Sequence, residues 1–188
     1  MIETIKAYDV IIKGLNENIR GLKAHPRILD KAEHKYLYPV YEKSMYIAIC
    51  LSDLIIGLKY LDVSKALKNG YETSYFSRNV AHMSYELINH QEKIIDTDVA
   101  KTIKNRIGDA AFSEFKGSTK ELKGVKKEYY KKLNYIRNNL FGNRTANGSE
   151  MAAAMLEIDD AEIYKIGKQI FDEYIKVIVA YVNLLSKL

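Results

Sequence analysis

The chain has 188 residues and a mass of 21.6 kDa, enough for one domain whose hydrophobic core needs no disulfide bonds. Hydrophobic residues make up 47% of it, charged residues 28%, and the mean hydropathy is -0.25, which excludes the disordered, collagen-like and membrane classes of protein. Ten glycines and two prolines are too few for the many turns of an all-β fold. We therefore expect a single all-α domain over residues 1–188.

Cys50 is the single cysteine, so the sequence offers neither a disulfide framework nor a cysteine metal site. The histidines are scattered and form no paired metal-binding motif. We expect no metal, no cofactor and a reducing, cytoplasmic setting. The most apolar segment, 45–58, contains Asp53 and is shorter than the about 20 residues that span a bilayer. It is therefore expected to be a buried helix, without a role in a membrane.

Apolar residues recur at helical spacing along most of the chain. A first helix is expected from about residue 5 to 22, ending near Pro26 because the residue before a proline is disfavoured in a helix. A second helix is expected over 30–61, with Pro39 as a break or a first-turn residue. The part after Pro39 is apolar on most sides, as in a helix that others surround. A third helix is expected over 72–95.

The second half of the chain is also punctuated by cap residues. A short helix is expected over 97–106, and Gly108 is a suitable residue to end it. The segment 118–121, Ser-Thr-Lys-Glu, has the pattern of a capping box and predicts the start of a helix that ends at Gly142. A looser stretch around 146–149 follows.

The last helix, expected from Asp159 or Asp160 almost to the C-terminus, has an unusually wide apolar face. Its members are Ile163, Ile166, Ile170, Phe171, Tyr174, Val177, Ile178, Tyr181, Leu184, Leu185 and Leu188. One bundle interior needs only part of this face, so the excess predicts a second contact, most simply with another copy in a homodimer. We expect a bundle of about five to six helices.

The positive charge is concentrated in one segment. Residues 116–144 contain nine Lys or Arg against two Glu, a net charge of +7, whereas the whole chain carries +5. Such a local concentration is typical of a protein that binds a polyanion, although a solvated lysine-rich helix face has the same composition. The candidate RNA-binding residues are Lys126, Lys127, Lys131, Lys132 and Arg144.

The most distinctive stretch lies at the end of this basic segment, at 135–144. It resembles the signature of the HEPN superfamily, small helical bundles whose motif is an Arg, usually followed by Asn, Asp or His, with a His four to six residues further on. Arg137 and Asn138 match the first two positions, and five residues separate Arg137 from Asn143. The sequence departs from the motif at its last position, where Asn143 replaces the His.

The resemblance implies an endoribonuclease of the toxin or antiviral-defence type, with an antitoxin or another defence protein as a partner. It implies metal-independent cleavage in a homodimer, by attack of a 2′-hydroxyl on the adjacent phosphate. The guanidinium of Arg137 suits the stabilisation of the charged phosphorane. Asn143 cannot transfer a proton, so we expect the chain to bind RNA better than it cuts it. Either the protein is a natural non-cleaving member, or Asn143 was introduced to silence it.

A second candidate cluster is formed by Arg78, His82 and Glu86, which are spaced by four residues on one side of the third helix. If this side meets Arg137, His82 offers the titratable group that the motif lacks and Glu86 offers a partner that orients Arg137. A solvated salt-bridge ladder is the simpler interpretation. The alternative function is a non-catalytic interaction module, in which Arg137 would be neutralised by a local carboxylate instead of lying at a dimer seam.

Overall fold

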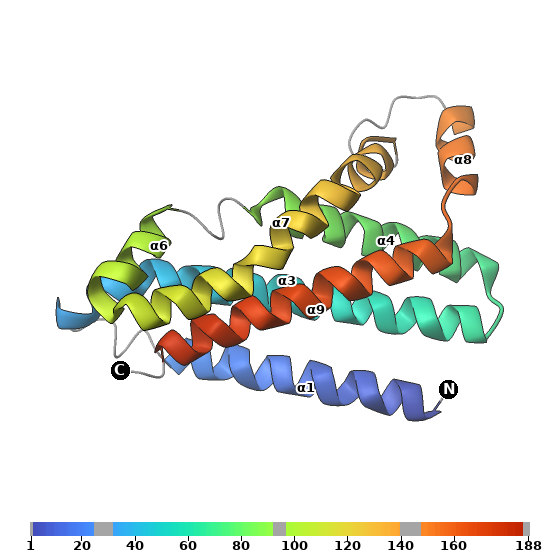
Figure 1. Cartoon of the computed structure of the whole chain (residues 1–188). Helices are drawn as coiled ribbons and strands as arrows, with labels where there is room; N and C mark the ends of the chain where they lie inside the picture. Colours follow the sequence, from blue (N-terminus) through green and yellow to red (C-terminus); the bar gives the residue numbers. More distant parts are fainter. Residues whose placement is uncertain (1, 25–31, 92–96, 140–147, 186–188) are drawn as a thin grey trace.

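The computed structural model describes residues 2–24, 32–91, 97–139 and 148–185, and every regular element in these ranges is a helix (Figure 1). The long helices are α1 (Ile2–Ala24), α3 (Tyr38–Ala66), α4 (Gly70–Asn89), α7 (Asp109–Arg137) and α9 (Asp160–Leu185). The shorter ones are η1 (Ala32–Leu37), α6 (Thr97–Thr102), the π-helix η2 (Ile103–Ile107) and α8 (Gly148–Leu156). The prediction of an all-α helical bundle is confirmed.

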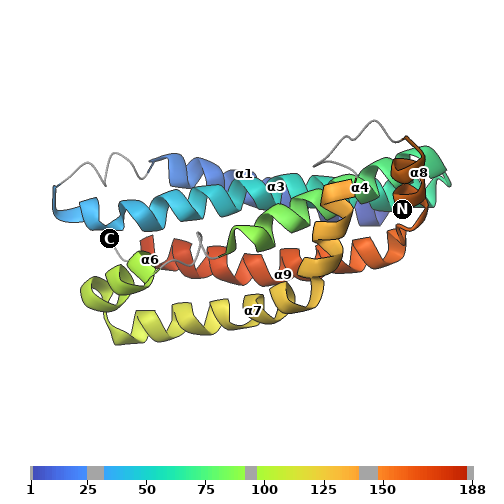
Figure 2. The ribbon, with the colours of Figure 1, turned by 90° about the horizontal axis from the view of Figure 1, so that it is seen from above.

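Helix α3 lies at the centre of the bundle. It packs against α1, α4 and α9, and α9 in turn packs against α7 and α4. Seen from above, α9 runs between α3 and α7 (Figure 2). Buried residues occur on most sides of α3, but Tyr46, Ile49, Ile56 and Tyr60 on its outer side are exposed, so other helices surround it only in part. Among the described residues, no helix is long and apolar enough to cross a membrane.

Several helix ends occur where the sequence predicts them. Pro39 lies in the first turn of α3, where its missing N–H costs no hydrogen bond. Gly108, with a φ of 112°, follows η2 and precedes α7. The Asp159 carboxylate accepts hydrogen bonds from the backbone N–H groups of Ala161 and Glu162, at 2.8 and 3.1 Å, and caps α9.

The predicted capping box at 118–121 is wrong. Helix α7 begins after Gly108 and runs through this segment without a break. The hydroxyl groups of Ser118 and Thr119 donate to backbone carbonyls of the preceding turn, at 2.7 and 3.1 Å, instead of capping free N–H groups. Within a helix, Ser and Thr can satisfy their hydroxyls in this way, so the pattern alone does not mark a helix start.

Two other boundaries differ from the prediction. Helix α4 ends at Asn89, whereas the sequence predicts a helix that continues to residue 95. Helix α8 begins at Gly148, within the stretch around 146–149 that was expected to be looser. Asn138 and Asn139 continue α7 in π-helical conformation. The predicted helix end at Gly142 lies outside the described residues.

The described part of the wide apolar face of α9 is buried within the chain, while the side chains of Leu184, Leu185 and Leu188 lie outside the description. Its buried members are Ile163, Ile166, Ile170, Phe171, Tyr174, Val177, Ile178 and Tyr181. The Tyr174 hydroxyl donates to the Leu87 carbonyl of α4 at 2.6 Å, and the Tyr164 hydroxyl lies 2.6 Å from that of Tyr8 on α1. Because α3, α4 and α7 cover this face, it is not a surplus that requires a second chain. The homodimer stays a prediction, but the apolar face of α9 no longer supports it.

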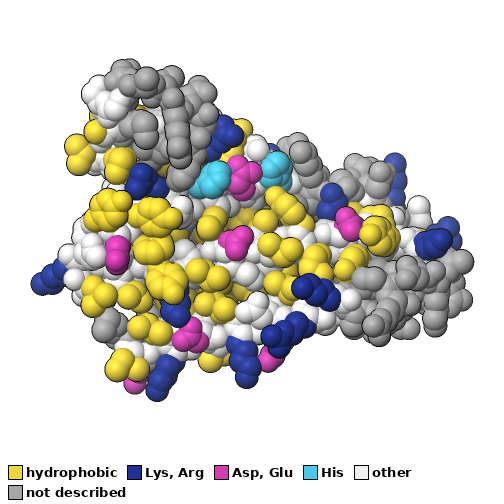
Figure 3. All heavy atoms as spheres, turned by 180° about the vertical axis from the view of Figure 1, so that it is seen from behind, with side chains coloured by type: hydrophobic (Ala, Val, Ile, Leu, Met, Phe, Trp, Pro, Cys, Tyr) yellow, Lys and Arg dark blue, Asp and Glu magenta, His cyan; other side chains and the backbone are white. Residues whose placement is uncertain are grey.

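A different surface is left apolar. The outer side of α3 and α4 carries exposed Tyr and Ile side chains, and Figure 3 shows hydrophobic side chains covering much of that side of the molecule. Acidic side chains are interspersed among them, and histidine side chains lie at the upper edge. An exposed apolar area of this kind is typical of an interaction surface.

Candidate functional site

Arg137 lies at the end of α7, where this helix packs against α4. Its guanidinium carbon is 5.8 Å from the centre of the Tyr85 ring, within the range of a cation–π contact. Its Nη1 donates to the Asn138 side-chain carbonyl at 3.1 Å. Among the described residues, no carboxylate forms an ion pair with Arg137. The guanidinium is therefore positioned by an aromatic ring and an amide while keeping its charge unneutralised.

The Tyr85 ring is one member of a row of aromatic and basic groups. It is 5.8 Å from the Tyr130 ring of α7, and the Lys126 ammonium is 5.8 Å from the centre of that second ring. Burial raises the pKa of Tyr85, the hydrogen bond with Tyr130 adds to this, and the charge of Arg137 acts in the opposite direction. Tyr85 is thus a neutral phenol at physiological pH. Its ring lies against the guanidinium of Arg137.

The exposed side of α7 carries a continuous row of lysines, which we call the lysine stripe. Its members are Lys116, Lys120, Lys123, Lys127 and Lys131, and all five are exposed. Their spacings of four, three, four and four residues place them along one side of the helix, over a length of about 22 Å. Glu121 and Glu128 fall on a different side by the same spacing. The stripe therefore presents positive charge without interspersed acidic groups.

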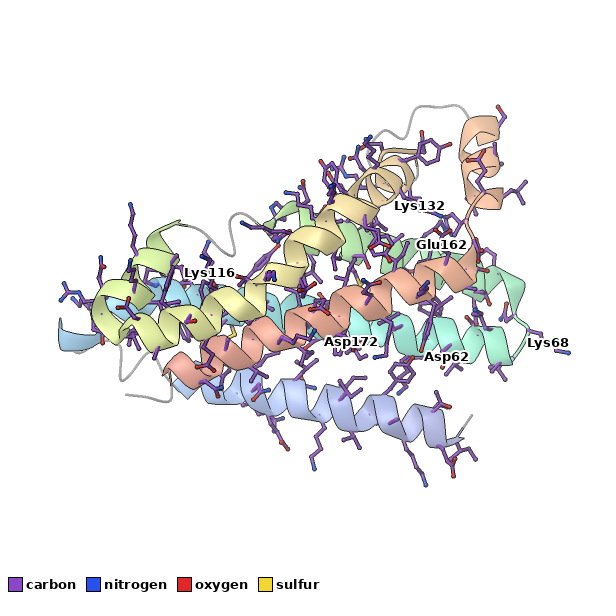
Figure 4. The ribbon with its side chains drawn as sticks, in the orientation of Figure 1. Asp62, Lys68, Lys116, Lys132, Glu162 and Asp172 are labelled. Carbon is purple, nitrogen blue, oxygen red and sulfur yellow. The ribbon has the colours of Figure 1, made fainter. Side chains whose placement is uncertain are left out.

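The stripe includes only part of the lysine set predicted from the sequence. Lys127 and Lys131 are exposed members of it. Lys132 turns away and forms an ion pair with Glu162 of α9, and the two side chains meet between these helices in Figure 4. Lys126 is half-buried and lies over Tyr130. Sequence reasoning grouped neighbours in the chain and left Lys116, Lys120 and Lys123 out, although helical spacing would have included them.

The N-terminal half of the stripe borders two shallow hollows. One, of about 340 Å³, has Phe112 at its apolar part and Lys116, Lys123 and Lys126 around it. The second, of about 370 Å³, is lined by Lys116, Lys120 and Lys123. These hollows make this end of the stripe a concave and positively charged surface.

Arg78, His82 and Glu86 share one side of α4, and among the described residues Arg78 and Glu86 form no hydrogen bond or ion pair with Arg137. The Arg78 side chain donates to the Ser74 carbonyl at 3.2 Å. Glu86 pairs with His90, with 3.0 Å between Oε2 and Nε2, and among the described residues it forms no ion pair with Arg137. The predicted orientation of Arg137 by Glu86 is therefore not formed; Tyr85, which no motif indicated, takes that position.

Two of the predicted site residues, Asn143 and Arg144, lie outside the described residues. Asn138 is exposed and accepts a hydrogen bond from Arg137. Within the described ranges, no group of three His, Cys, Asp or Glu residues is arranged to hold a metal ion.

No protein-family model, no curated protein and no solved structure matches the chain. The fold and the surface described above define it as an all-α helical bundle with a lysine stripe on α7, and the function has to be argued from that surface.

Proposed function

We propose that this chain binds RNA through the lysine stripe and Arg137, and that it is a HEPN-type ribonuclease fold in which Asn143 silences cleavage. The observation that carries the proposal is the arrangement on α7. Five exposed lysines lie along one side of the helix, and at its end Arg137 has no carboxylate partner among the described residues.

The size and chemistry of the stripe suit a nucleic-acid backbone. Five ammonium groups along about 22 Å can neutralise successive phosphates, and release of the counterions drives such binding. The planar guanidinium of Arg137 can make two parallel hydrogen bonds to one phosphate, which a lysine cannot. Lysines would thus supply affinity along the strand, and Arg137 would fix one phosphate in place.

The state of Arg137 also bears on the alternative function. In an interaction module that does not use this residue, a local carboxylate would be expected to neutralise it. Among the described residues its partners are Tyr85 and Asn138, neither of which carries a charge. This supports a role for Arg137 toward an external anion.

The chemistry of silencing follows from the motif. Attack by a ribose 2′-hydroxyl requires a group that accepts its proton near neutral pH, and imidazole does this while a carboxamide does not. An amide at Asn143 can still hydrogen-bond to a ribose or phosphate. The protein would therefore hold RNA at the site without breaking the chain.

A charge-reversal experiment tests RNA binding. Changing Lys120, Lys123, Lys127 and Lys131 together to Glu should abolish the binding of single-stranded RNA in a fluorescence anisotropy titration. The matched control reverses four exposed basic residues outside α7, namely Lys6, Arg20, Lys23 and Lys101. The control has the same net charge, so it should weaken binding only slightly. Equal losses in both variants, or no loss in the first, would contradict the proposal.

A protein-interaction function is the second candidate, because the outer face of α3 and α4 is apolar and exposed. The two functions use different surfaces. They can therefore be tested separately.

A further inference from the structure

The outer side of α3 carries a regular row of large apolar side chains. Tyr46, Ile49, Ile56 and Tyr60 are 39%, 48%, 39% and 45% exposed. Together with Asp53 they follow each other at spacings of three and four residues, so they lie on one side of the helix. No other described helix covers this row, because each of these four side chains stays partly exposed.

Aromatic contacts join this row to α4. The rings of Tyr60 and Phe76 are stacked with centroids 5.3 Å apart, and the rings of Tyr46 and His90 meet edge to face at 6.4 Å. Helices α3 and α4 therefore present one continuous layer, which we call the α3–α4 face. Exposure of these apolar side chains to water is unfavourable, and burial against another surface would remove that cost.

The pattern on this face is nearly symmetric. In α3 the order Tyr46, Ile49, Asp53, Ile56, Tyr60 reads the same in both directions about Asp53. In α4 a basic and an acidic residue, Arg78 and Glu86, lie four residues before and four residues after His82.

Asp53 and His82 lie at the same level of the bundle, since both line one hollow of about 300 Å³ between the two helices. The two centres of symmetry therefore coincide. A two-fold axis at this level, lying in the interface and perpendicular to the helices, would reverse the direction of every helix. It would bring each residue of the face opposite its counterpart on the other side of the centre.

We propose that the α3–α4 face binds a second copy of this chain, with α3 antiparallel to the α3 of that copy and α4 antiparallel to its α4. In this arrangement Tyr46 meets the partner subunit's Tyr60. Arg78 meets the partner subunit's Glu86, and the symmetric pair forms a second time. Charge complementarity is what selects a second copy as the occupant, because the face carries opposite charges at equal distances from its own centre.

The local contacts of these charges are compatible with the pairing. Glu86 uses Oε2 for His90, which leaves Oε1 for the partner subunit's Arg78. Arg78 uses Nε for the Ser74 carbonyl at 3.2 Å and Nη1 for the Met155 sulfur of α8 at 3.8 Å, and it retains the N–H donors of Nη2. Asp53 is the unfavourable position in this pairing, since its carboxylate faces the same negatively charged group of the partner subunit at the axis. The hollow beside it leaves room for water to solvate both carboxylates.

The pairing has a consequence for Arg137. Tyr85, which holds Arg137, is three residues from His82, about 4.5 Å along α4. Both Tyr85–Arg137 pairs therefore lie near the axis and at the same edge of the interface. The inference itself rests on the α3–α4 face alone and does not depend on RNA binding.

Charge exchange tests the arrangement, with sedimentation velocity of the full chain over a range of concentrations as the measurement. The unchanged protein should form dimers. Arg78→Glu alone and Glu86→Arg alone should each weaken the dimer about tenfold or more, because like charges then face each other twice. An equimolar mixture of the two variants should form dimers again, as all the facing charges are then opposite. The double variant R78E/E86R should also recover.

Control variants separate the face from the rest of the surface. Ile49→Asp and Ile56→Asp should each dissociate the dimer, whereas Val10→Asp on α1, where the side chain is 71% exposed, should not. Circular dichroism checks that each variant remains helical. A monomer at all concentrations, or a dimer that the changes at Ile49 and Ile56 leave intact, would overturn the proposal. A dimer weakened by both single charge changes but not recovered in the mixture would overturn the antiparallel register.

Discussion

The guanidinium of Arg137 is held by groups that do not neutralise it, and this is the main result at the scale of single residues. The sequence motif indicates Arg137 and Asn138 as candidate site residues, and their role stays a prediction. It could not indicate Tyr85, because the ring comes from α4, about fifty residues earlier in the chain, and depends on how α4 packs against α7. The pairing of Lys132 with Glu162 of α9 is non-local in the same way.

Placing an imidazole at position 143 should restore RNA cleavage. We expect Asn143→His to cleave single-stranded RNA about 10²- to 10⁴-fold faster than the unchanged chain, which is the usual contribution of general acid–base catalysis. Because the motif implies metal-independent cleavage, this activity should persist in EDTA and leave cyclic phosphate ends. A gel assay with end-labelled RNA measures the rate and the product ends.

Two further variants make this test specific. Arg137→Ala in the Asn143→His background should lower the rate about 10²- to 10³-fold, because one preorganised cationic donor is lost. Asn147→His, which adds an imidazole outside the motif, should not cleave. Equal cleavage by the unchanged chain and by Asn143→His would point to another base, and no cleavage by either, with RNA binding intact, would leave the silencing hypothesis without support.

The cap of α9 gives a pH dependence of known sign. Backbone N–H groups of Glu162 and Ala161 lower the pKa of the Asp159 carboxyl below its ordinary value. A lowered pKa in the folded state means that the cap stabilises the protein above the ordinary pKa, and that this stabilisation is lost as the pH falls through the folded value. Asp159→Ala should therefore lower the melting temperature at pH 7, and the difference from the unchanged protein should shrink below about pH 4. A difference that is constant down to pH 2 would contradict this.

At the scale of helices, local signals predicted most of the elements. Periodic apolar residues and the expected breaks at Pro26 and Pro39 marked α1 and α3, and Gly108 marked the end of the short helical segment before α7. The capping box at 118–121 failed because the same residues are satisfied within a helix. Helix α8 was missed because its composition, rich in alanine and without a clear apolar stripe, carries little periodic signal.

A glycine in α9 permits the close approach of three helices. A Cβ added at Gly167 would lie 2.6 Å from a methyl group of Val80 on α4 and 3.1 Å from one of Leu58 on α3. Gly167→Ala should therefore lower the free energy of unfolding by about 1–3 kcal/mol, since the packed core has no room for the methyl group. Urea denaturation measures this change, and the slope of the free energy of unfolding against urea concentration should stay the same in both proteins.

Gly124 in α7 is the matched control, because an added Cβ there meets nothing within 4 Å. Gly124→Ala should raise the free energy of unfolding by about 0.5–1 kcal/mol, the ordinary advantage of alanine over glycine in a helix. The two substitutions are chemically identical, so opposite signs are expected from packing alone. The same sign for both would contradict the packing argument.

At the scale of the whole molecule, the distribution of apolar surface was the least predictable feature. The sequence shows how apolar α9 is, but not that α3, α4 and α7 together cover it. Conversely, α3 is so apolar that a fully buried helix was the natural expectation, yet its outer row from Tyr46 to Tyr60 is exposed. Which side of an apolar helix is left open depends on the arrangement of its neighbours. For the same reason, the α3–α4 face could be found only in the folded structure.

The charge of the molecule shows a similar division. The sequence shows that the positive charge is concentrated in residues 116–144. The fold shows which of these residues form the exposed lysine stripe. It also shows that Lys132 pairs with Glu162 and that Lys126 is half-buried over Tyr130. The proposed function requires that this stripe and Arg137 together contact RNA phosphates.

The salt dependence of RNA affinity tests that claim most directly. Six cationic groups on a single strand predict a slope of about -4 when the logarithm of the association constant is plotted against the logarithm of salt concentration. Lys127→Ala with Lys131→Ala should make the slope shallower by about 1.4, while Lys6→Ala with Lys23→Ala on α1 should leave it unchanged. A slope near zero, or one that responds equally to both pairs of substitutions, would contradict RNA binding by the lysine stripe.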